Sequence, residues 1–191
     1  MRRRVIIFLD FEASSLGKRG FPIEVGWAAE DGTEEGHLIR PAPGWEEWST
    51  EAEGIHGITR DRLQREGRPH DEVARRMVET LTGHDLYASA PSWDGQWLSK
   101  LLRAAGLPRH ALRLRDTDEA QQDTALAVLA RAGVPVGAQR GIVDGILEAV
   151  RQAATAEPPA HRAPEDARRE LSLWRDVVRQ AERAAVRWPE R

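Results

Sequence analysis

Three runs within the first forty residues have the apolar and polar patterning that is typical of β-strands. The first is an unbroken apolar run over residues 5–9 that passes into alternation up to residue 13, and the others cover residues 23–29 and 35–40. The dipeptide Asp31-Gly32, between the second and third runs, favours a tight hairpin turn. Because the connections are short, the pattern predicts three consecutive antiparallel strands.

Beyond residue 60 the apolar residues recur mostly with the helical period. Gly83, Gly106 and Gly133 each follow such a stretch and are placed to end a helix. Short apolar runs at residues 85–90 and 112–114 are predicted as the fourth and fifth strands. Helices are expected over residues 71–82, 92–105, 117–132, 142–150 and 164–188, with an exposed loop over residues 153–163 and a loop with a short helix over residues 45–60.

The composition is that of an ordinary soluble globular protein, and it predicts a single domain over residues 1–191. Apolar residues make up 40% and charged residues 31% of the chain, and no membrane-length apolar segment occurs. The chain has no cysteine, which excludes disulfides and thiolate metal sites and fits a cytoplasmic protein. Its formal net charge of −3 gives no overall attraction to nucleic acid, so phosphate binding would require a local basic patch or a bound metal.

The end of the first predicted strand carries two carboxylates on one face. Residues i and i+2 of a strand point the same way, so Asp10 and Glu12 lie side by side while Leu9 and Phe11 point into the opposite layer. Such a pair repels itself and loses hydration, a cost that cations or protons must offset. An isolated pair of this kind is also compatible with a strand that ends in a polar loop.

Two more acids lie at the ends of predicted elements. Asp94 follows the fourth strand where the next helix begins, and Asp166 lies in the first turn of the last helix. Each also has a purely structural explanation, because an acid at a helix N-terminus caps the helix or complements its dipole. His161 lies five residues before Asp166. Sites are commonly built at the ends of elements, so the four acids are candidates for one common site.

Three motifs that contain these residues resemble the DEDD superfamily of 3′→5′ exonucleases, in its histidine-containing (DEDDh, DnaQ-like) branch. They are FLDFEASSL, APSWDGQWL and HRAPEDA, in the family's order and spacing. The resemblance extends from Val5 to about Ala185, and the stretches IEVGWA and GIHGIT are also similar to the family. The chain departs from the family pattern at residues 13–16, where Thr-Thr-Gly-Leu is commoner, and at Trp93, where Phe is usual. These departures concern substrate preference more than chemistry.

The resemblance implies a ribonuclease H-like α/β fold, with a five-stranded mixed sheet of three antiparallel N-terminal strands followed by parallel ones, and with helices on both faces. It also implies a metal-dependent phosphodiester hydrolase that removes nucleoside 5′-monophosphates from the 3′ end of single-stranded DNA or RNA. Carboxylate oxygens suit Mg²⁺ or Mn²⁺, and the family uses two ions. The implied roles are metal ligation by Asp10, Glu12, Asp94 and Asp166, general base catalysis by His161, and binding of the terminal base and sugar by Leu16 and backbone groups around Ser14.

A catalytically idle nucleic-acid-binding or adaptor domain with the same fold is the alternative function. Loss of one carboxylate would indicate such a domain, and none is lost. A hydrolase with a Ser-His-Asp triad is poorly supported, because no G-x-S-x-G motif occurs. Some relatives with a similarly compact chain are homodimers, so the resemblance is also consistent with a homodimer.

Two further features have more than one interpretation. His56 in GIHGIT could contact substrate, although a packed or solvated histidine is the more ordinary role. The last helix carries four arginines spaced four residues apart, which we interpret as a solvated face beside neighbouring acids rather than as a track for nucleic acid: Arg175, Arg179, Arg183 and Arg187.

Overall fold

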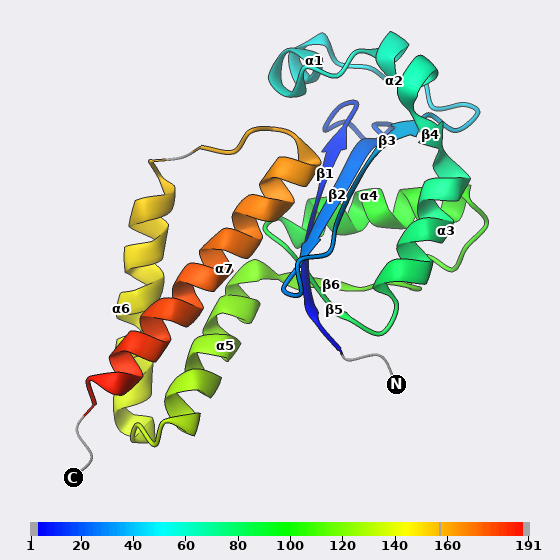
Figure 1. The fold of residues 1–191 in the computed structure, drawn as a ribbon. Helices are drawn as coiled ribbons and strands as arrows, with labels where there is room; N and C mark the ends of the chain where they lie inside the picture. The colour runs from blue at the N-terminus through cyan, green and yellow to red at the C-terminus, as the bar shows by residue number, and fades with distance from the viewer. Residues whose placement is uncertain (1–3, 157, 189–191) are drawn as a thin grey trace.

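A mixed sheet of six strands lies between two layers of helices in a computed structural model that describes residues 4–156 and 158–188 (Figure 1). The strand order is β4-β3-β2-β1-β5-β6. The strands are β1 Ile6–Ala13, β2 Pro22–Ala29, β3 Glu34–Arg40, β4 Arg68–Pro69, β5 Asp85–Ala88 and β6 Leu114–Asp116.

The strand pairing confirms the mixed sheet and corrects the predicted number of strands from five to six. Strands β1, β2 and β3 are antiparallel, β5 is parallel to β1, and β6 is parallel to β5. The additional strand, β4, is two residues long and parallel to β3. Its Pro69 has no N–H to donate, and two residues are too few to show an alternating pattern. The sequence therefore held no signal for this strand.

Helices cover both faces of the sheet, as predicted. Helices α3 and α4 share an apolar core with one face, and α5 and α7 share another core with the opposite face, while α6 packs on α5 and α7 (Figure 1). Two short helices, rather than the one predicted, follow β3, and α6 is longer than expected. The helices are α1 Thr50–His56, α2 Arg60–Glu66, α3 His70–Leu81, α4 Pro91–Ala104, α5 Thr117–Arg131, α6 Val136–Ala154 and α7 Ala163–Val186.

Alternation along β1 assigns its side chains to the two layers. Ile7, Leu9 and Phe11 belong to the core beneath α3 and α4. Phe8 packs with Trp174 of α7 on the other side, at a ring distance of 6.1 Å. Asp10 and Glu12 continue the Phe8 face, so the strand directs both carboxylates toward the layer that contains α7.

A second apolar core joins α5, α6 and the C-terminal half of α7 beyond the sheet. It includes Leu129, Ile146 and Val177. The arginines predicted to form a solvated face lie along this part of α7. Arg179 pairs with Asp176, and Arg175 donates to the Glu30 carbonyl at 3.3 Å. Among the described residues, none of the helices combines the length and apolar character needed to cross a bilayer.

The first turn of α7 rests directly on the sheet at two glycines. A Cβ added to Gly26 of β2 would overlap backbone atoms of Ala163 and Pro164, and one added to Gly36 of β3 would lie 2.5 Å from Pro164 Cγ. Gly26 is also the residue that pairs with Asp10 across the sheet. The absence of side chains at these positions therefore lets the start of α7 approach the carboxylates of β1.

We expect Gly26→Ala to lower the free energy of unfolding by about 1–3 kcal/mol, the usual cost of overpacking, because helix and strand must separate to admit the methyl group. Gly145→Ala is the matched control. Gly145 lies in α6 with no atom within 4 Å of an added Cβ, so alanine there should add about 0.5–1 kcal/mol through its helix propensity. Urea denaturation of both variants measures the difference, and equal stability of Gly26→Ala and the wild type would contradict the close contact.

Candidate active site

The end of β1 and the start of α7 bring three carboxylates together. Asp10, Glu12 and Asp166 each offer one oxygen, and these oxygens lie within 4.8 Å of one another. Asp10 and Glu12 are half-buried, and Asp166 is buried. The i and i+2 positions in β1 place the first two, and the contact of α7 with Gly26 brings in the third.

Asp166 also closes the loop that leads into its own helix. Its Oδ1 accepts a hydrogen bond from the Ala160 N–H at 2.8 Å, and its Oδ2 accepts one from the Arg162 N–H at 3.2 Å. Each carboxylate oxygen has two acceptor positions, so these bonds leave capacity for a cation. The loop geometry therefore fixes the orientation of the Asp166 carboxylate.

Asp94 approaches the cluster from the opposite layer, in the first turn of α4. Strand β5, which pairs with β1, ends at Ala88. Beyond that end, the Phe11 N–H of β1 donates a hydrogen bond to Asp94 Oδ1 at 3.3 Å. The Asp94 side chain is buried, and its Oδ2 has no hydrogen-bond partner among the described residues. Asp94 lies outside the group of three mutually close oxygens, yet its charge acts on Asp10.

Burial and mutual repulsion make the charged forms of these acids costly. Burial, followed by the charges of Asp94 and Glu12, raises the pKa of Asp10 well above its ordinary value. Burial, followed by the Asp166 charge, raises the pKa of Glu12 to about 7. Burial also raises the pKa of Asp94 to about 7. Near neutral pH the cluster therefore retains protons unless cations compensate its charge.

The donor set fits a hard divalent cation. All candidate ligand atoms are carboxylate oxygens, the type that Mg²⁺ and Mn²⁺ prefer. The buried Asp94 Oδ2 has no donor within the part of the chain that the structure describes, which is costly for a polar atom that no cation or proton satisfies. The residues therefore suit a metal site between β1, α4 and α7.

His161 lies in the loop before α7, and its side chain is exposed. Its backbone has a φ of 55°, the left-handed conformation that residues with a side chain seldom adopt. It is not part of the group of close ligand atoms formed by Asp10, Glu12 and Asp166. His161 thus lies, with an exposed side chain, in the loop that Asp166 closes, and its role as a base stays a prediction.

Ser14 and Leu16 have different surroundings in the loop after β1. The Ser14 N–H donates to the Phe21 carbonyl at 2.9 Å, its carbonyl accepts from Ser49 at 2.9 Å, and its hydroxyl accepts from the Phe21 N–H at 3.1 Å. Leu16 is 72% exposed in this loop. Ser14 therefore shapes the loop that presents Leu16, and the predicted contacts of both residues with a terminal nucleotide stay predictions.

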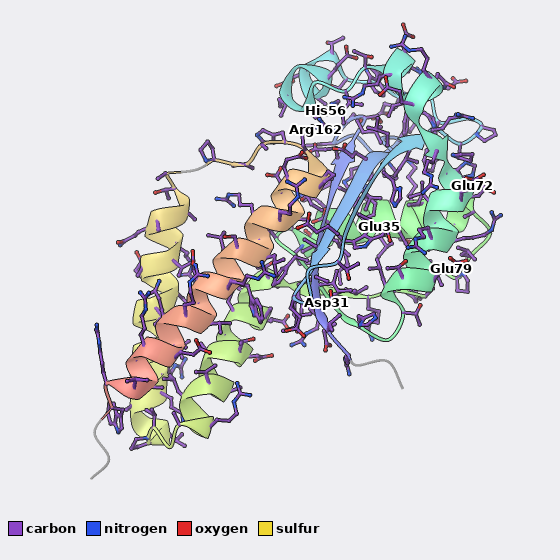
Figure 2. All side chains as sticks on the ribbon, in the orientation of Figure 1. Asp31, Glu35, His56, Glu72, Glu79 and Arg162 are labelled. Carbon is purple, nitrogen blue, oxygen red and sulfur yellow. The ribbon has the colours of Figure 1, made fainter. Side chains whose placement is uncertain are left out.

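His56 is packed, in agreement with the more ordinary of its two interpretations. It is 5% exposed, and its Nδ1 accepts from the Ile58 N–H at 3.0 Å. Burial lowers the pKa of this ring, on which the charges of Glu24 and Arg162 also act. Figure 2 shows His56 and Arg162 together at the end of the sheet where α7 begins.

Two residues beside the cluster were not singled out by sequence reasoning. Glu24 of β2 pairs with Glu12 across the sheet and is 2% exposed. It accepts two hydrogen bonds from the guanidinium of Arg162, at 3.0 Å and 2.6 Å. The sequence signal that could have identified Glu24 is its charge, because every other residue of the run 22–29 is apolar or glycine. A charge in a strand buried on both faces requires a partner.

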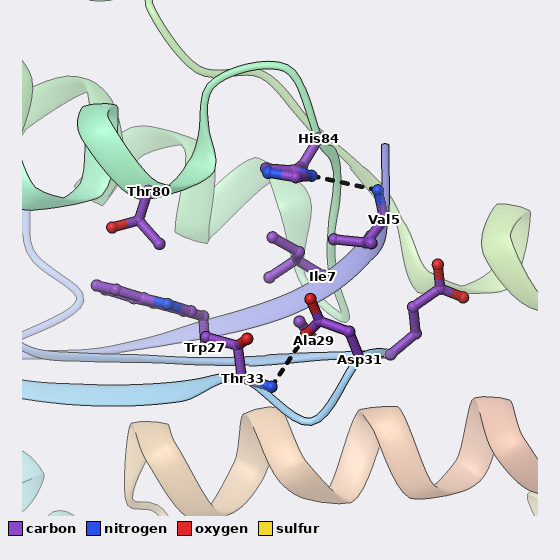
Figure 3. Close-up of a pocket in the computed structure, with 9 residues that line it drawn as sticks. Val5, Ile7, Trp27, Ala29, Asp31, Thr33, Thr80 and His84 are labelled. Carbon is purple, nitrogen blue, oxygen red and sulfur yellow. Dashed lines mark hydrogen bonds between the residues drawn. The ribbon is translucent and has the colours of Figure 1, made fainter. Parts of the chain in front are cut away.

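A separate cavity of about 490 Å³ lies near the other end of β1 (Figure 3). Its walls include Val5, Ile7 and Trp27, with His84 accepting the Val5 N–H through Nδ1 at 3.2 Å. These apolar residues belong to the core beneath α3 and α4, on the face away from the carboxylates. The cavity is therefore distinct from the carboxylate cluster.

The raised pKa of Glu12 predicts how metal-free stability changes with pH. Its folded pKa of about 7 exceeds its ordinary value of 4.5, so the folded state binds more protons over this interval and stability falls as pH rises through it. We expect the Tm in chelator to fall from about pH 4.5 to about pH 7 and Mg²⁺ to restore it. Asp10→Asn should reduce both effects in thermal unfolding, unlike the exposed control Asp144→Asn. The same pH profile in Asp10→Asn and in the wild type would contradict the raised pKa of Asp10.

Comparisons with known proteins connect this fold to exonucleases. No protein-family model matches the chain, and no curated protein matches it. Among solved structures, apo exonuclease I matches with a TM-score of 0.55 and 17% identity, over 65% of this chain and 32% of that chain. Escherichia coli exonuclease I in complex with a dA16 oligonucleotide matches with a TM-score of 0.53 and 15% identity, over 66% and 30% of the two chains.

A zinc-bound complex of E. coli exonuclease I with single-stranded DNA matches similarly, with a TM-score of 0.53 and 16% identity, over 66% of this chain and 30% of that chain. The present chain thus spans about a third of the length of the exonuclease I structures that it resembles. At this level of identity the likeness concerns the fold. The mixed α/β sheet with helices on both faces is similar to the fold of these exonuclease I structures.

Proposed function

We propose that this protein is a metal-dependent 3′→5′ exonuclease that removes nucleoside 5′-monophosphates from single-stranded DNA or RNA. The observation that carries the proposal is the cluster of desolvated carboxylates at one end of a sheet similar to that of exonuclease I, together with the buried Asp94 oxygen that no other described residue hydrogen-bonds. The matched structures include exonuclease I complexes with oligonucleotides. They support single-stranded nucleic acid as the substrate class.

The proposed metal ligands are Asp10, Glu12, Asp94 and Asp166. These carboxylates would hold two Mg²⁺ or Mn²⁺ ions, which would supply the positive charge that activates water and stabilises the leaving oxygen. His161 in its neutral form would accept a proton from the attacking water through a ring nitrogen. The water oxygen bonds to phosphorus, and the bond from phosphorus to the 3′ oxygen of the preceding nucleotide breaks. The terminal nucleotide then leaves with its 5′ phosphate.

A preference for unpaired 3′ ends is part of the proposal. Leu16 projects from a loop whose backbone is held by Phe21 and Ser49, so it offers an exposed apolar surface on a fixed support. A base can stack on such a surface only when it is not paired. One ladder assay tests polarity, sugar preference and strandedness together. It compares matched 5′-labelled single-stranded DNA, single-stranded RNA and blunt duplex. Faster digestion of the duplex would exclude this preference.

The alternative of an idle binding or adaptor domain is less well supported, because the four carboxylates and the histidine are all present. A homodimer stays a prediction, and light scattering on the purified chain would test it. A cytoplasmic location likewise stays a prediction.

We expect Asp94→Asn to abolish hydrolysis while the protein stays folded. The amide keeps an oxygen that can accept the Phe11 N–H but loses the negative charge that a divalent cation requires. Asp144→Asn makes the same chemical change on the exposed face of α6 and should retain full activity. Oligonucleotide digestion with and without EDTA provides the measurement, together with circular dichroism. Undiminished hydrolysis in excess chelator would refute the metal mechanism.

We expect His161→Ala to lower turnover by about 10²- to 10⁴-fold, the usual contribution of a general base, with metal binding and substrate affinity retained. His110→Ala, which alters an exposed histidine between α4 and β6, is the matched control. Steady-state kinetics and calorimetric Mg²⁺ titration measure the two properties separately. Turnover at the wild-type rate would remove His161 from the mechanism even if the carboxylates prove essential.

A further inference from the structure

An ion pair with a buried carboxylate connects the loop that carries His161 to the central sheet. The Glu24 side chain is 3% exposed and the Arg162 side chain 31% exposed. Glu24 accepts two guanidinium hydrogen bonds, and its Oε2 also accepts the Ala163 N–H at 3.0 Å. Glu24 thus binds both a side chain and the backbone at the start of α7. A bidentate ion pair of this kind fixes the orientation of the two groups as well as their distance.

Asp166 binds the same loop from the other side. Its carboxylate accepts the N–H groups of Ala160 and Arg162. Between them, Glu24 and Asp166 hold the amides of residues 160, 162 and 163, which leaves His161 as the residue enclosed by these contacts. The two carboxylates come from β2 and α7, so the loop is bound to two rigid elements.

The left-handed backbone of His161 is consistent with this arrangement. A φ of 55° at a residue with a side chain persists where the surrounding structure determines it. The bonds at residues 160, 162 and 163 are the contacts that determine it here. Because the backbone direction at His161 sets the direction of its Cα–Cβ bond, these contacts also decide where the imidazole can reach.

We infer that Glu24 and Arg162 are positioning residues that set the backbone from which His161 reaches the substrate, an inference that rests on the proposed exonuclease function. Neither residue needs to touch nucleic acid for this role. Arg162 already directs two of its donors at Glu24, and Glu24 is too deeply buried to be left without its partner. Their contribution to the rate is therefore exerted through His161.

Glu24→Gln tests the inference, because glutamine can still accept the Ala163 N–H but no longer matches the charge of Arg162. We expect kcat to fall about 10²-fold, the scale of a misplaced catalytic group, while KM stays at its wild-type value. Arg162→Lys should retain more activity than Arg162→Gln, because lysine keeps the charge although it cannot form the bidentate pair.

Glu34→Gln is the matched control. It breaks the exposed pair with Arg168, which also joins the sheet to α7, and should leave kcat unchanged.

The double variant Glu24→Gln/His161→Ala separates positioning from a general effect on the fold or the metals. If Glu24 acts through His161, adding Glu24→Gln to His161→Ala causes little further loss of kcat. An equal loss in both backgrounds would overturn the inference, as would an unchanged kcat in Glu24→Gln alone, and either result leaves the proposed function standing. A wild-type chain that fails to digest any oligonucleotide with Mg²⁺ or Mn²⁺ would overturn the proposed function and the inference together.

Discussion

The close contact between the first turn of α7 and the sheet is the constraint on which the candidate site depends. Gly26 and Gly36 admit Pro164 to distances that a side chain would forbid. That approach brings Asp166 to Asp10 and Glu12 and sets Arg162 against Glu24. The acids repel one another, so the packing of helix on sheet must offset an electrostatic cost in the metal-free protein. Structural stability and site geometry are therefore set by the same contact.

The elements with strong local signals could be predicted from the sequence. The antiparallel strands β1 to β3 and the ends of α3, α4 and α5 follow from alternation, helical period and well-placed glycines. Strand β4 could not, because a two-residue pairing with β3 is created by tertiary contact alone. The weak pattern around Gly141 and Gly145 also hid the true length of α6, since its stability comes from packing against α5 and α7.

The parts of the candidate site formed by residues close together in the sequence could be predicted, and the parts formed by contacts between distant residues could not. The shared face of Asp10 and Glu12 follows from strand geometry, and the structure brings Asp166 beside them. The partnership of Glu24 and Arg162 joins residues 138 positions apart, and no local pattern specifies it. The lack of a hydrogen-bond partner for Asp94 Oδ2 among the described residues likewise depends on where β5 ends relative to β1. Such details require the packed structure.

Helix α7 joins the two halves of the molecule. It has 24 residues and is thus about 36 Å long, with its N-terminal turn beside the carboxylates and its C-terminal half in the separate core with α5 and α6. The turn between α5 and α6 lies at the far end of this helical layer (Figure 1). Gly133 in that turn is exposed, and exposed turns tolerate insertions. A fluorophore, surface tether or fused module attached there would leave the approach to the carboxylates unobstructed.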